Sequence, residues 1–322
     1  MVSLWRFYAL IVWALLVWGA AGYLISRRVS SYVSRRHAEE PSPAEAPSRS
    51  YLWFERTVYA LSVLGVVLFA YSFVEPYRPA VVRVTIPAPG LAAGRPIRVV
   101  HLSDLHCDPR PRAEPRLPGM VAGLEPDLIV FTGDAVNSDA GLPIFRNCME
   151  ELTRIAPVYA VIGNWEAWWF AHLDLYGGTG VRALLDETVS VEVDGRRFHI
   201  AGVSVDHEPR IPDVLARVPR ESFCLFLHHF PAAAAEASEG GADVLLCGDT
   251  HGGQVWLPLL GEMVRIERHG VWMPRGLHRV GEAYVYVNRG IGMEGGSAPR
   301  VRFMTRPEVT LVELVPAEGA VR

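Results

Sequence analysis

The chain has 322 residues, 50% of them hydrophobic, and a formal net charge of −4. This length is enough for one sizeable folded core and for additional apolar segments. Its basic side chains are arginines without any lysine, interspersed with acidic residues rather than gathered in one stripe, which argues against a nucleic-acid-binding protein. The four cysteines lack a C-x-x-C spacing, so we expect buried free thiols rather than disulfides at Cys107, Cys148, Cys224 and Cys247.

Two uncharged apolar runs occur near the start of the chain, at about 7–25 and 57–74. Each is about long enough to cross a hydrocarbon core of ~30 Å as a helix. We therefore predict that 1–80 is a membrane anchor with two transmembrane helices. A cleaved signal peptide is the alternative for the first run, but that run is long for a signal peptide.

The loop between the two apolar runs is rich in arginine and contains a Pro/Ser/Ala/Glu-rich linker, 39–50, that we expect to be disordered. The arginines of this loop are Arg27, Arg28, Arg35, Arg36 and Arg49. Positive charge favours the cytoplasmic side, so we predict a cytoplasmic loop and place the rest of the chain on the non-cytoplasmic face. The expected location is the bacterial cytoplasmic membrane.

A connector at 81–96 is expected to begin with a strand at 81–86. After it, short apolar runs alternate with helix-like segments, which predicts a layered α/β domain. The expected strands begin at Ile97 and continue at 128–132, 158–162, 223–229 and 244–247. The expected helices lie near 112–124, 143–155 and 231–239. A hairpin of two antiparallel strands, 189–193 and 198–203, is expected around Asp194-Gly195.

Five of the apolar runs end in residues that can bind a metal ion. Side chains alternate faces in an extended chain, so Asp104 and His106, two residues apart, should project to the same side. Each of these motifs alone has an ordinary structural explanation, such as a turn or a core histidine. No such explanation accounts for five of them in one domain. The five are Asp104-Leu105-His106, Gly133-Asp134, Gly163-Asn164, His228-His229 and Gly248-Asp249-Thr250-His251.

This ordered set of motifs resembles that of the calcineurin-like metallophosphoesterases, over roughly residues 95–314. The resemblance extends to the membrane-anchored branch, which includes bacterial UDP-2,3-diacylglucosamine pyrophosphatases and transmembrane metallophosphoesterases. It implies a four-layer αββα sandwich at 97–315, followed by a tail at 316–322. It also implies two divalent metal ions, with Mn²⁺ favoured and Mg²⁺, Fe or Zn²⁺ as alternatives.

The resemblance assigns a role to each motif residue. Asp104, His106 and His251 would hold one metal ion, Asp134 would bridge both, and Asn164 and His229 would hold the second. His228 is the alternative to His229 as a ligand. Asp249 replaces a histidine of the family as a further ligand, and this carboxylate favours Mn²⁺ or Mg²⁺ over softer ions.

The implied reaction is attack on phosphorus by a metal-bridging hydroxide held by Asp134. Trp165 stands where many relatives have a histidine that is credited with protonating the leaving oxygen, and an indole has no such proton to give. The candidates for a replacement donor are Glu166, His228 and His207. Without a donor, a good leaving group is favoured, as in a pyrophosphate.

We therefore expect a membrane-anchored hydrolase of a phosphodiester or pyrophosphate bond. Its phosphorylated substrate could be lipid-linked, such as UDP-2,3-diacylglucosamine in the lipid A pathway. The aromatic residues after the asparagine motif, Trp168 and Trp169 among them, are expected in a helix core, with an apolar wall for an acyl chain as the alternative. A non-catalytic metal-binding scaffold or sensor at the membrane is the alternative function.

Overall fold

A computed structural model of the chain describes residues 2–3, 5–36, 47–294 and 300–317. These residues form two compact units, Leu4–Phe73 and a larger unit that joins Val74–Arg322 with Met1–Ser3. Residues 39–46 of the expected disordered linker and 318–322 of the expected tail lie outside the described residues. The four cysteines are buried and free, as the sequence predicted.

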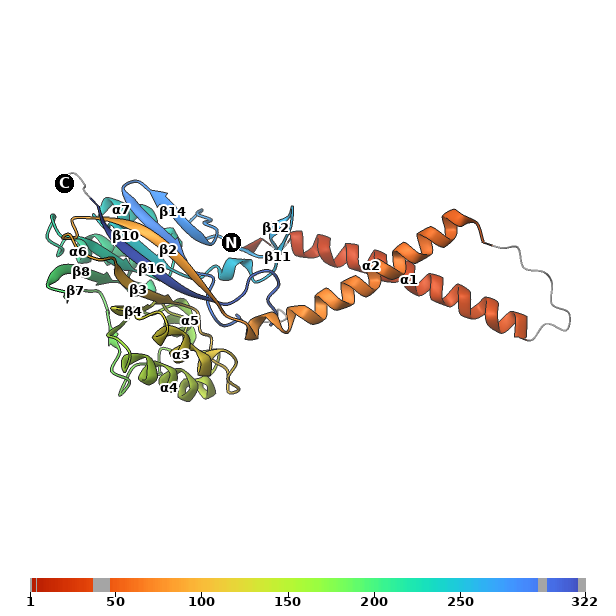
Figure 1. Cartoon of the computed structure of the whole chain (residues 1–322), viewed down its shortest axis with the longest axis horizontal. Helices are drawn as coiled ribbons and strands as arrows, with labels where there is room; N and C mark the ends of the chain where they lie inside the picture. The colour runs from red at the N-terminus through yellow and green to blue at the C-terminus, as the bar shows by residue number, and fades with distance from the viewer. Residues whose placement is uncertain (1, 4, 37–46, 295–299, 318–322) are drawn as a thin grey trace. The chain divides into compact units, whose positions relative to one another are not determined.

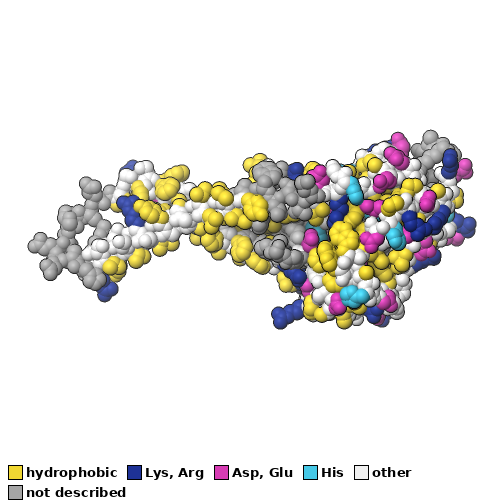
Figure 2. Space-filling view, turned by 180° about the vertical axis from the view of Figure 1, so that it is seen from behind, with side chains coloured by type: hydrophobic (Ala, Val, Ile, Leu, Met, Phe, Trp, Pro, Cys, Tyr) yellow, Lys and Arg dark blue, Asp and Glu magenta, His cyan; other side chains and the backbone are white. Residues whose placement is uncertain are grey.

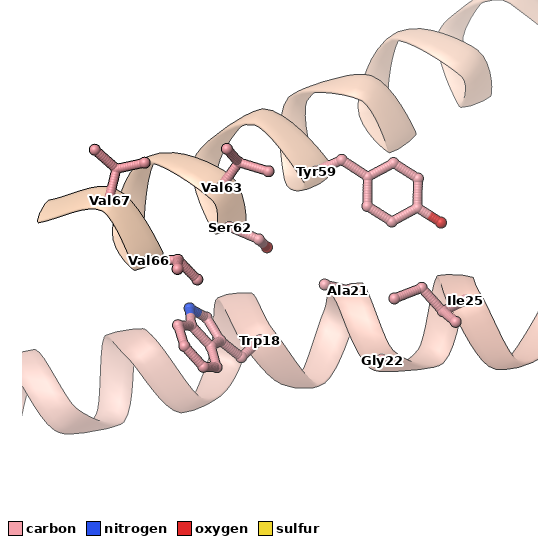
Figure 3. Close-up of a pocket in the computed structure, with 9 residues that line it drawn as sticks. All are labelled: Trp18, Ala21, Gly22, Ile25, Tyr59, Ser62, Val63, Val66 and Val67. Atoms are coloured by element: carbon pink, nitrogen blue, oxygen red, sulfur yellow. The ribbon is translucent and has the colours of Figure 1, made fainter. Parts of the chain in front are cut away.

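The smaller unit consists of two helices, α1 (Trp5–Arg36) and α2 (Arg49–Ser72). At the start of α2 the hydroxyl oxygen of Ser48 accepts a hydrogen bond from the N–H of Tyr51 at 3.2 Å, which caps the helix. Figure 3 shows that apolar side chains from both helices, including the indole of Trp18, line the space between them.

Within the described part of the chain, one helical segment, Arg49–Tyr77, is long and apolar enough to cross a membrane. It covers the second predicted span, 57–74, whereas the first, 7–25, lies within α1 and stays a prediction. Large apolar side chains of α2 are exposed, with Val63 at 64% and Phe69 at 59%. Figure 2 shows hydrophobic side chains over much of the visible surface of this unit. This exposure is unlike that of a buried core helix of a soluble protein.

The larger unit contains two six-stranded mixed sheets. The first has the order β2-β16-β3-β4-β5-β6 and the second the order β14-β15-β10-β9-β8-β7. The strands of the first sheet are β2 (Ala80–Pro89), β16 (Glu308–Ala317), β3 (Ile97–Leu102), β4 (Leu128–Phe131), β5 (Val158–Ala160) and β6 (Arg182–Ala183). The strands of the second are β14 (Gly276–Val280), β15 (Ala283–Val287), β10 (Val244–Cys247), β9 (Cys224–Leu227), β8 (Arg196–Gly202) and β7 (Glu187–Val193).

Short elements complete this unit. Two small sheets pair β1 (Val2–Ser3) with β13 (Arg265–Ile266), and β11 (Trp256–Leu257) with β12 (Gly261–Glu262). The α-helices are α3 (Leu117–Ala122), α4 (Leu142–Thr153), α5 (Asn164–Trp169), α6 (Ile211–Leu215) and α7 (Ala234–Glu239). The 3₁₀ helices are η1 (Glu75–Tyr77), η2 (Glu114–Arg116), η3 (Asp139–Gly141), η4 (Val205–Arg210), η5 (Pro231–Ala233) and η6 (His251–Gly253).

Alternation along the strands explains the four layers. In β3, Val99 faces a core shared by both sheets, whereas Val100 faces a core shared with α3 and α4. In β10, Leu246 faces the shared core and Leu245 faces α6 and α7. Strands buried on both faces read as continuous apolar runs, as these do. Figure 1 shows α3 and α4 beyond β3 and β4, so the layers follow the predicted αββα sandwich.

Two details differ from the sequence-based expectation or refine it. The strand predicted at 81–86 within the connector is confirmed and is longer than predicted, because β2 pairs in parallel with β16 along its whole length and therefore belongs to the first sheet. The predicted hairpin is present, because β7 and β8 pair antiparallel from Glu187↔Gly202 to Val193↔Arg196.

Candidate metal centre

The motif residues follow strands that lie side by side in the two sheets. β3, β4 and β5 are neighbours in parallel in the first sheet, and β9 and β10 are neighbours in parallel in the second. Carboxyl ends of parallel neighbours meet at one edge of a sheet, so the loops after these strands converge. The five loops carry the predicted ligands Asp104, His106, Asp134, Asn164, His229, Asp249 and His251.

The backbone at five of these residues takes the left-handed conformation, which is sparsely populated outside glycine. Their φ angles are 50° at Asp104, 42° at His106, 60° at Asp134, 67° at Asp249 and 50° at His251. The expectation that Asp104 and His106 share a face of an extended strand was therefore wrong in its reasoning. β3 ends at Leu102, and turns of positive φ bring the two side chains together.

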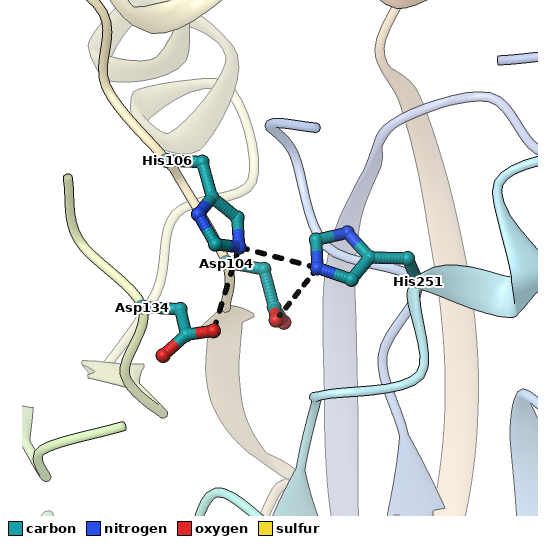
Figure 4. A group of neighbouring side chains, drawn as sticks. All are labelled: Asp104, His106, Asp134 and His251. Atoms are coloured by element: carbon teal, nitrogen blue, oxygen red, sulfur yellow. Dashed lines mark hydrogen bonds and ion pairs between the residues drawn. The ribbon is translucent and has the colours of Figure 1, made fainter. Parts of the chain in front are cut away.

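Asp104, His106, Asp134 and His251 form a buried cluster whose ligand atoms all lie within 4.8 Å of one another. Figure 4 shows the four side chains pointing toward a common centre. His106 Nε2 lies 3.2 Å from His251 Nε2 and 3.4 Å from Asp134 Oδ2, and His251 Nε2 lies 3.4 Å from Asp104 Oδ1. Two imidazoles and two carboxylates at such distances are a donor set that suits a divalent cation.

The electrostatics of the cluster also fit a bound cation. Asp104 Oδ2 is buried and has no hydrogen-bond partner among the described residues, and the same is true of His229 Nε2. Burial raises the pKa of Asp104 to about 6. Burial alone would lower the pKa of His229, but the nearby carboxylate of Asp134 raises it to about 10. Unsatisfied buried donors and acceptors of this kind are costly unless an ion uses them.

The other predicted ligands are His229 and Asn164, assigned to a second metal ion, and Asp249, the further ligand, and two of these three already bind a side chain of the protein. His229 Nε2 lies 3.4 Å from Asp134 Oδ2 and 3.9 Å from Asp249 Oδ1. Asp249 and Asn164, however, both accept hydrogen bonds from the guanidinium of Arg268. The cluster of four is thus consistent with one half of a dinuclear site, and the ligand roles of Asn164, His229 and Asp249 remain predictions.

Neighbouring groups hold the imidazoles in place. His106 Nδ1 lies 3.0 Å from Asn137 Oδ1, and the amide nitrogen of Asn137 donates to the carbonyl oxygen of His106 at 3.0 Å. His229 Nδ1 lies 2.7 Å from the carbonyl oxygen of Thr132. Such partners fix the ring orientation and leave Nε2 of each imidazole directed at the site.

Glu166 is buried, and both of its carboxylate oxygens accept hydrogen bonds from the backbone. Its oxygens accept from the N–H groups of Asp134 (2.9 Å), Ala135 (2.5 Å) and Gly163 (3.0 Å). Burial, followed by the charge of Asp134, raises the pKa of Glu166 to about 7, which would suit a proton donor. The geometry instead favours a positioning role, because the carboxylate anchors the loop that carries Asp134.

His228, the other predicted proton donor, is fully buried. Its Nδ1 accepts a hydrogen bond from the N–H of Phe230 at 3.1 Å, and its ring stacks on that of Phe226. Burial lowers the pKa of His228 to about 3, so the ring is neutral at neutral pH. These contacts favour a structural role in the core and match the preference for His229 as the ligand.

Trp165 lies against the cluster. Its backbone N–H donates a hydrogen bond to Asp134 Oδ1 at 3.0 Å. Its ring is nearly perpendicular to that of His106, and the ring centroids are 5.0 Å apart. Trp168 and Trp169 are 50% and 55% exposed. The expectation that these two residues pack in a helix core was therefore wrong. Both lie at the end of α5, a helix of only six residues, and their rings are exposed to solvent.

Arg268 and Asn137 were not identified from the sequence. Asn137 lies beyond the end of a motif, and no spacing points to it. Arg268 lies 19 residues after Asp249, in a stretch without a recognisable motif. The one signal was Asp249 itself, because a carboxylate in place of a neutral ligand leaves a charge that needs a partner.

Comparisons with known proteins agree with the motif set. The family model described as calcineurin-like phosphoesterase matches residues 97–253. Phosphodiesterase YaeI of Escherichia coli (strain K12) is 30% identical over 232 residues, 68% of this chain and 83% of that protein. The uncharacterized metallophosphoesterase YkuE of Bacillus subtilis (strain 168) is 29% identical, covering 59% of this chain and 68% of that protein. A transmembrane protein with metallophosphoesterase domain from Danio rerio is 28% identical, covering 98% of this chain and 74% of that protein.

Proposed function

This chain belongs to the calcineurin-like phosphoesterase family and is a hydrolase of phosphoester bonds, and we propose that a divalent metal ion at the four-residue cluster supports its catalysis. The observation that carries the proposal is the convergence of Asp104, His106, Asp134 and His251. A divalent ion held there would supply Lewis acidity and water of lowered pKa. Mn²⁺ is our first choice of ion, since the donors are oxygen and imidazole nitrogen.

The protein's own contribution is to position these donors. Asn137 holds the His106 ring, the Thr132 carbonyl holds the His229 ring, and Glu166 holds the backbone at Asp134. Preorganised groups need no rearrangement as charge develops on the phosphoryl oxygens. The aromatic ring of Trp165 lies against the buried ring of His106.

The test is hydrolysis of bis-p-nitrophenyl phosphate by the full-length protein in detergent, with and without Mn²⁺. We expect Mn²⁺-dependent turnover in the wild type and a loss of about 100-fold or more in Asp134→Asn, which removes a charged ligand. Replacing Mn²⁺ by Mg²⁺, Fe²⁺ or Zn²⁺ in turn ranks the metals. No turnover with any metal, or turnover that Asp134→Asn does not reduce, would refute the proposal and favour a non-catalytic scaffold.

We further propose that the scissile bond has a good leaving group, as in a pyrophosphate. Trp165 can give no proton, and the surroundings of Glu166 and His228 support positioning or structural roles rather than proton donation. An alkoxide leaving group needs a proton far more than a phosphate does. Steady-state rates on a nucleotide-diphospho-lipid and on an alkyl phosphodiester compare the two, and a clear preference for the alkyl ester contradicts this part.

A lipid-linked substrate such as UDP-2,3-diacylglucosamine is our proposed substrate class. Support comes from the apolar helix Arg49–Tyr77 and from the exposed rings of Trp168 and Trp169 near the site. The ring centre of Trp168 lies 5.3 Å from the guanidinium carbon of Arg268. The variants Trp168→Ala and Trp169→Ala should reduce turnover of a lipid substrate more than that of bis-p-nitrophenyl phosphate, and equal losses would contradict an acyl-chain wall.

We propose that two helices anchor the protein in the bacterial cytoplasmic membrane, with the catalytic unit on the non-cytoplasmic face. The arginines of the loop between the apolar runs support this orientation. A UDP-linked lipid is a cytoplasmic metabolite, so substrate and orientation predict opposite sides of the membrane. Protease treatment of sealed inside-out vesicles decides between them, because a non-cytoplasmic catalytic unit is protected and a cytoplasmic one is degraded.

A further inference from the structure

The guanidinium of Arg268 contacts oxygens of two predicted metal ligands, Asn164, which was assigned to the second metal ion, and Asp249, the further ligand. Its Nη2 donates to Asp249 Oδ1 at 2.6 Å and to Asn164 Oδ1 at 3.2 Å. Its Nε lies 3.1 and 3.0 Å from the two carboxylate oxygens of Asp249. Asp249 and Asn164 are almost fully buried, so this is not a loose surface ion pair. Two of the predicted metal ligands, Asn164 and Asp249, are therefore already bound to a cation that belongs to the chain.

A backbone turn and the ring of Phe230 hold Arg268 in place. It lies at the base of a two-residue turn, His269-Gly270, whose φ angles of 49° and 76° are those of a type I′ hairpin. Arg268 and Val271 close the turn with backbone hydrogen bonds of 3.0 and 2.7 Å. The Cζ atom of Arg268 lies 3.9 Å from the ring centre of Phe230, an arrangement that favours a cation over the ring face.

A metal ion at this place would have to displace Arg268. Arginine cannot lose its charge at neutral pH, so the guanidinium and a second metal ion compete for the same oxygens. Displacement would break the paired hydrogen bonds to Asp249 as well as the contact with Phe230. Charge-assisted bonds of this kind correspond to about 10-fold or more in affinity each.

We propose that the Arg268 guanidinium takes the place of the second metal ion, so that the chain binds a single divalent ion tightly. This inference rests on the proposed phosphoesterase function and states which cations that site holds. It accounts for the replacement of a family histidine by Asp249, because a neutral imidazole carries no charge and could not form an ion pair with a guanidinium. Among the described residues, none accepts a hydrogen bond from Arg268 Nη1, which leaves that group for a substrate phosphoryl oxygen.

The test is the metal stoichiometry of the full-length protein in detergent, measured by equilibrium dialysis with Mn²⁺ and by electron paramagnetic resonance. We expect one tightly bound Mn²⁺ per chain with the spectrum of an isolated ion, and a second site at least about 100-fold weaker. Arg268→Gln, and Arg268→Gln combined with Asp249→His, should bring the second affinity to within about 10-fold of the first and give a magnetically coupled pair. Arg265→Gln is the matched control, because Arg265 packs on Trp272 instead and should leave the stoichiometry at one.

Two tight ions in the wild type, with the coupled spectrum, would overturn the inference, and so would an Arg268→Gln variant that still binds only one. The wild-type measurement is decisive by itself if the variants do not fold. Different results would refute the proposed function, namely an absence of metal binding or of Mn²⁺-dependent hydrolysis. A wild type that hydrolyses phosphodiesters with two ions would therefore refute the role of Arg268 and leave the phosphoesterase function standing.

Discussion

Glu166 offers the clearest test of how the fold supports the metal cluster. In Glu166→Ala, the backbone N–H groups of Gly163, Asp134 and Ala135 lose their acceptor while they remain buried. Each buried, unsatisfied N–H costs about 1–3 kcal/mol. Three of them give a loss of about 3 kcal/mol or more in the free energy of unfolding, which lowers Tm by at least about 6 °C for a unit of this size.

The assay is thermal unfolding of the full-length protein in detergent, followed by tryptophan fluorescence, together with Mn²⁺-dependent hydrolysis. Glu166→Gln keeps one acceptor oxygen and should fall between the wild type and Glu166→Ala. Glu282→Ala is the control, because the Glu282 side chain is 81% exposed and its ion pair with Arg279 should contribute less than about 1 kcal/mol.

Activity separates a positioning role from a merely stabilising one. Asp134 lies in the loop that Glu166 anchors, so we expect kcat to fall about 10- to 100-fold in Glu166→Ala at temperatures where the variant is folded. A Glu166→Ala variant with a Tm within about 2 °C of the wild type would refute the hydrogen-bond reasoning. A destabilised variant with unchanged kcat would refute the link to Asp134.

Three further predictions concern the metal cluster. Asn137→Ala should weaken Mn²⁺ binding about 10- to 100-fold, because the His106 ring loses its orienting partner, and unchanged affinity in calorimetry would contradict this. In the metal-free protein the carboxylate of Asp134 raises the pKa of His229 to about 10 and raises that of His106 above its ordinary value despite burial, so both rings keep their protons to a higher pH than a free imidazole does. A ring must lose its proton to bind a metal ion, so Mn²⁺ binding should release protons and tighten as pH rises from 6 to 8, and calorimetric heats that do not depend on the buffer would contradict this. Removing Mn²⁺ from a sample at 100 times its Kd should lower the free energy of unfolding by about 2.7 kcal/mol, and a Tm insensitive to chelation would show that the ion does not bind the folded state.

The positions of Asp104, Asp134, Asn164, His229 and Asp249 could be predicted because each follows a short apolar strand. A buried strand needs a continuous apolar run, and the polar residue at its end has to leave the core. The order of such runs therefore predicts both the sheets and the edge at which the loops meet. The alternation of apolar runs with helix-like segments predicted a layered α/β domain, whereas the four-layer arrangement was implied only by the resemblance to a known family.

The sequence by itself determined that Asp104, His106, Asp134 and His251 belong to motifs at strand ends, because strand ends and motif residues are local features of the chain. Only the tertiary structure decided how those residues are used. Arg268 reaches Asp249 through a turn that no local pattern connects to the cluster, and Glu166 is occupied by N–H groups from a loop about 30 residues earlier. Contacts between distant segments depend on how the sheets pack, and packing is a property of the whole fold rather than of any one stretch of sequence.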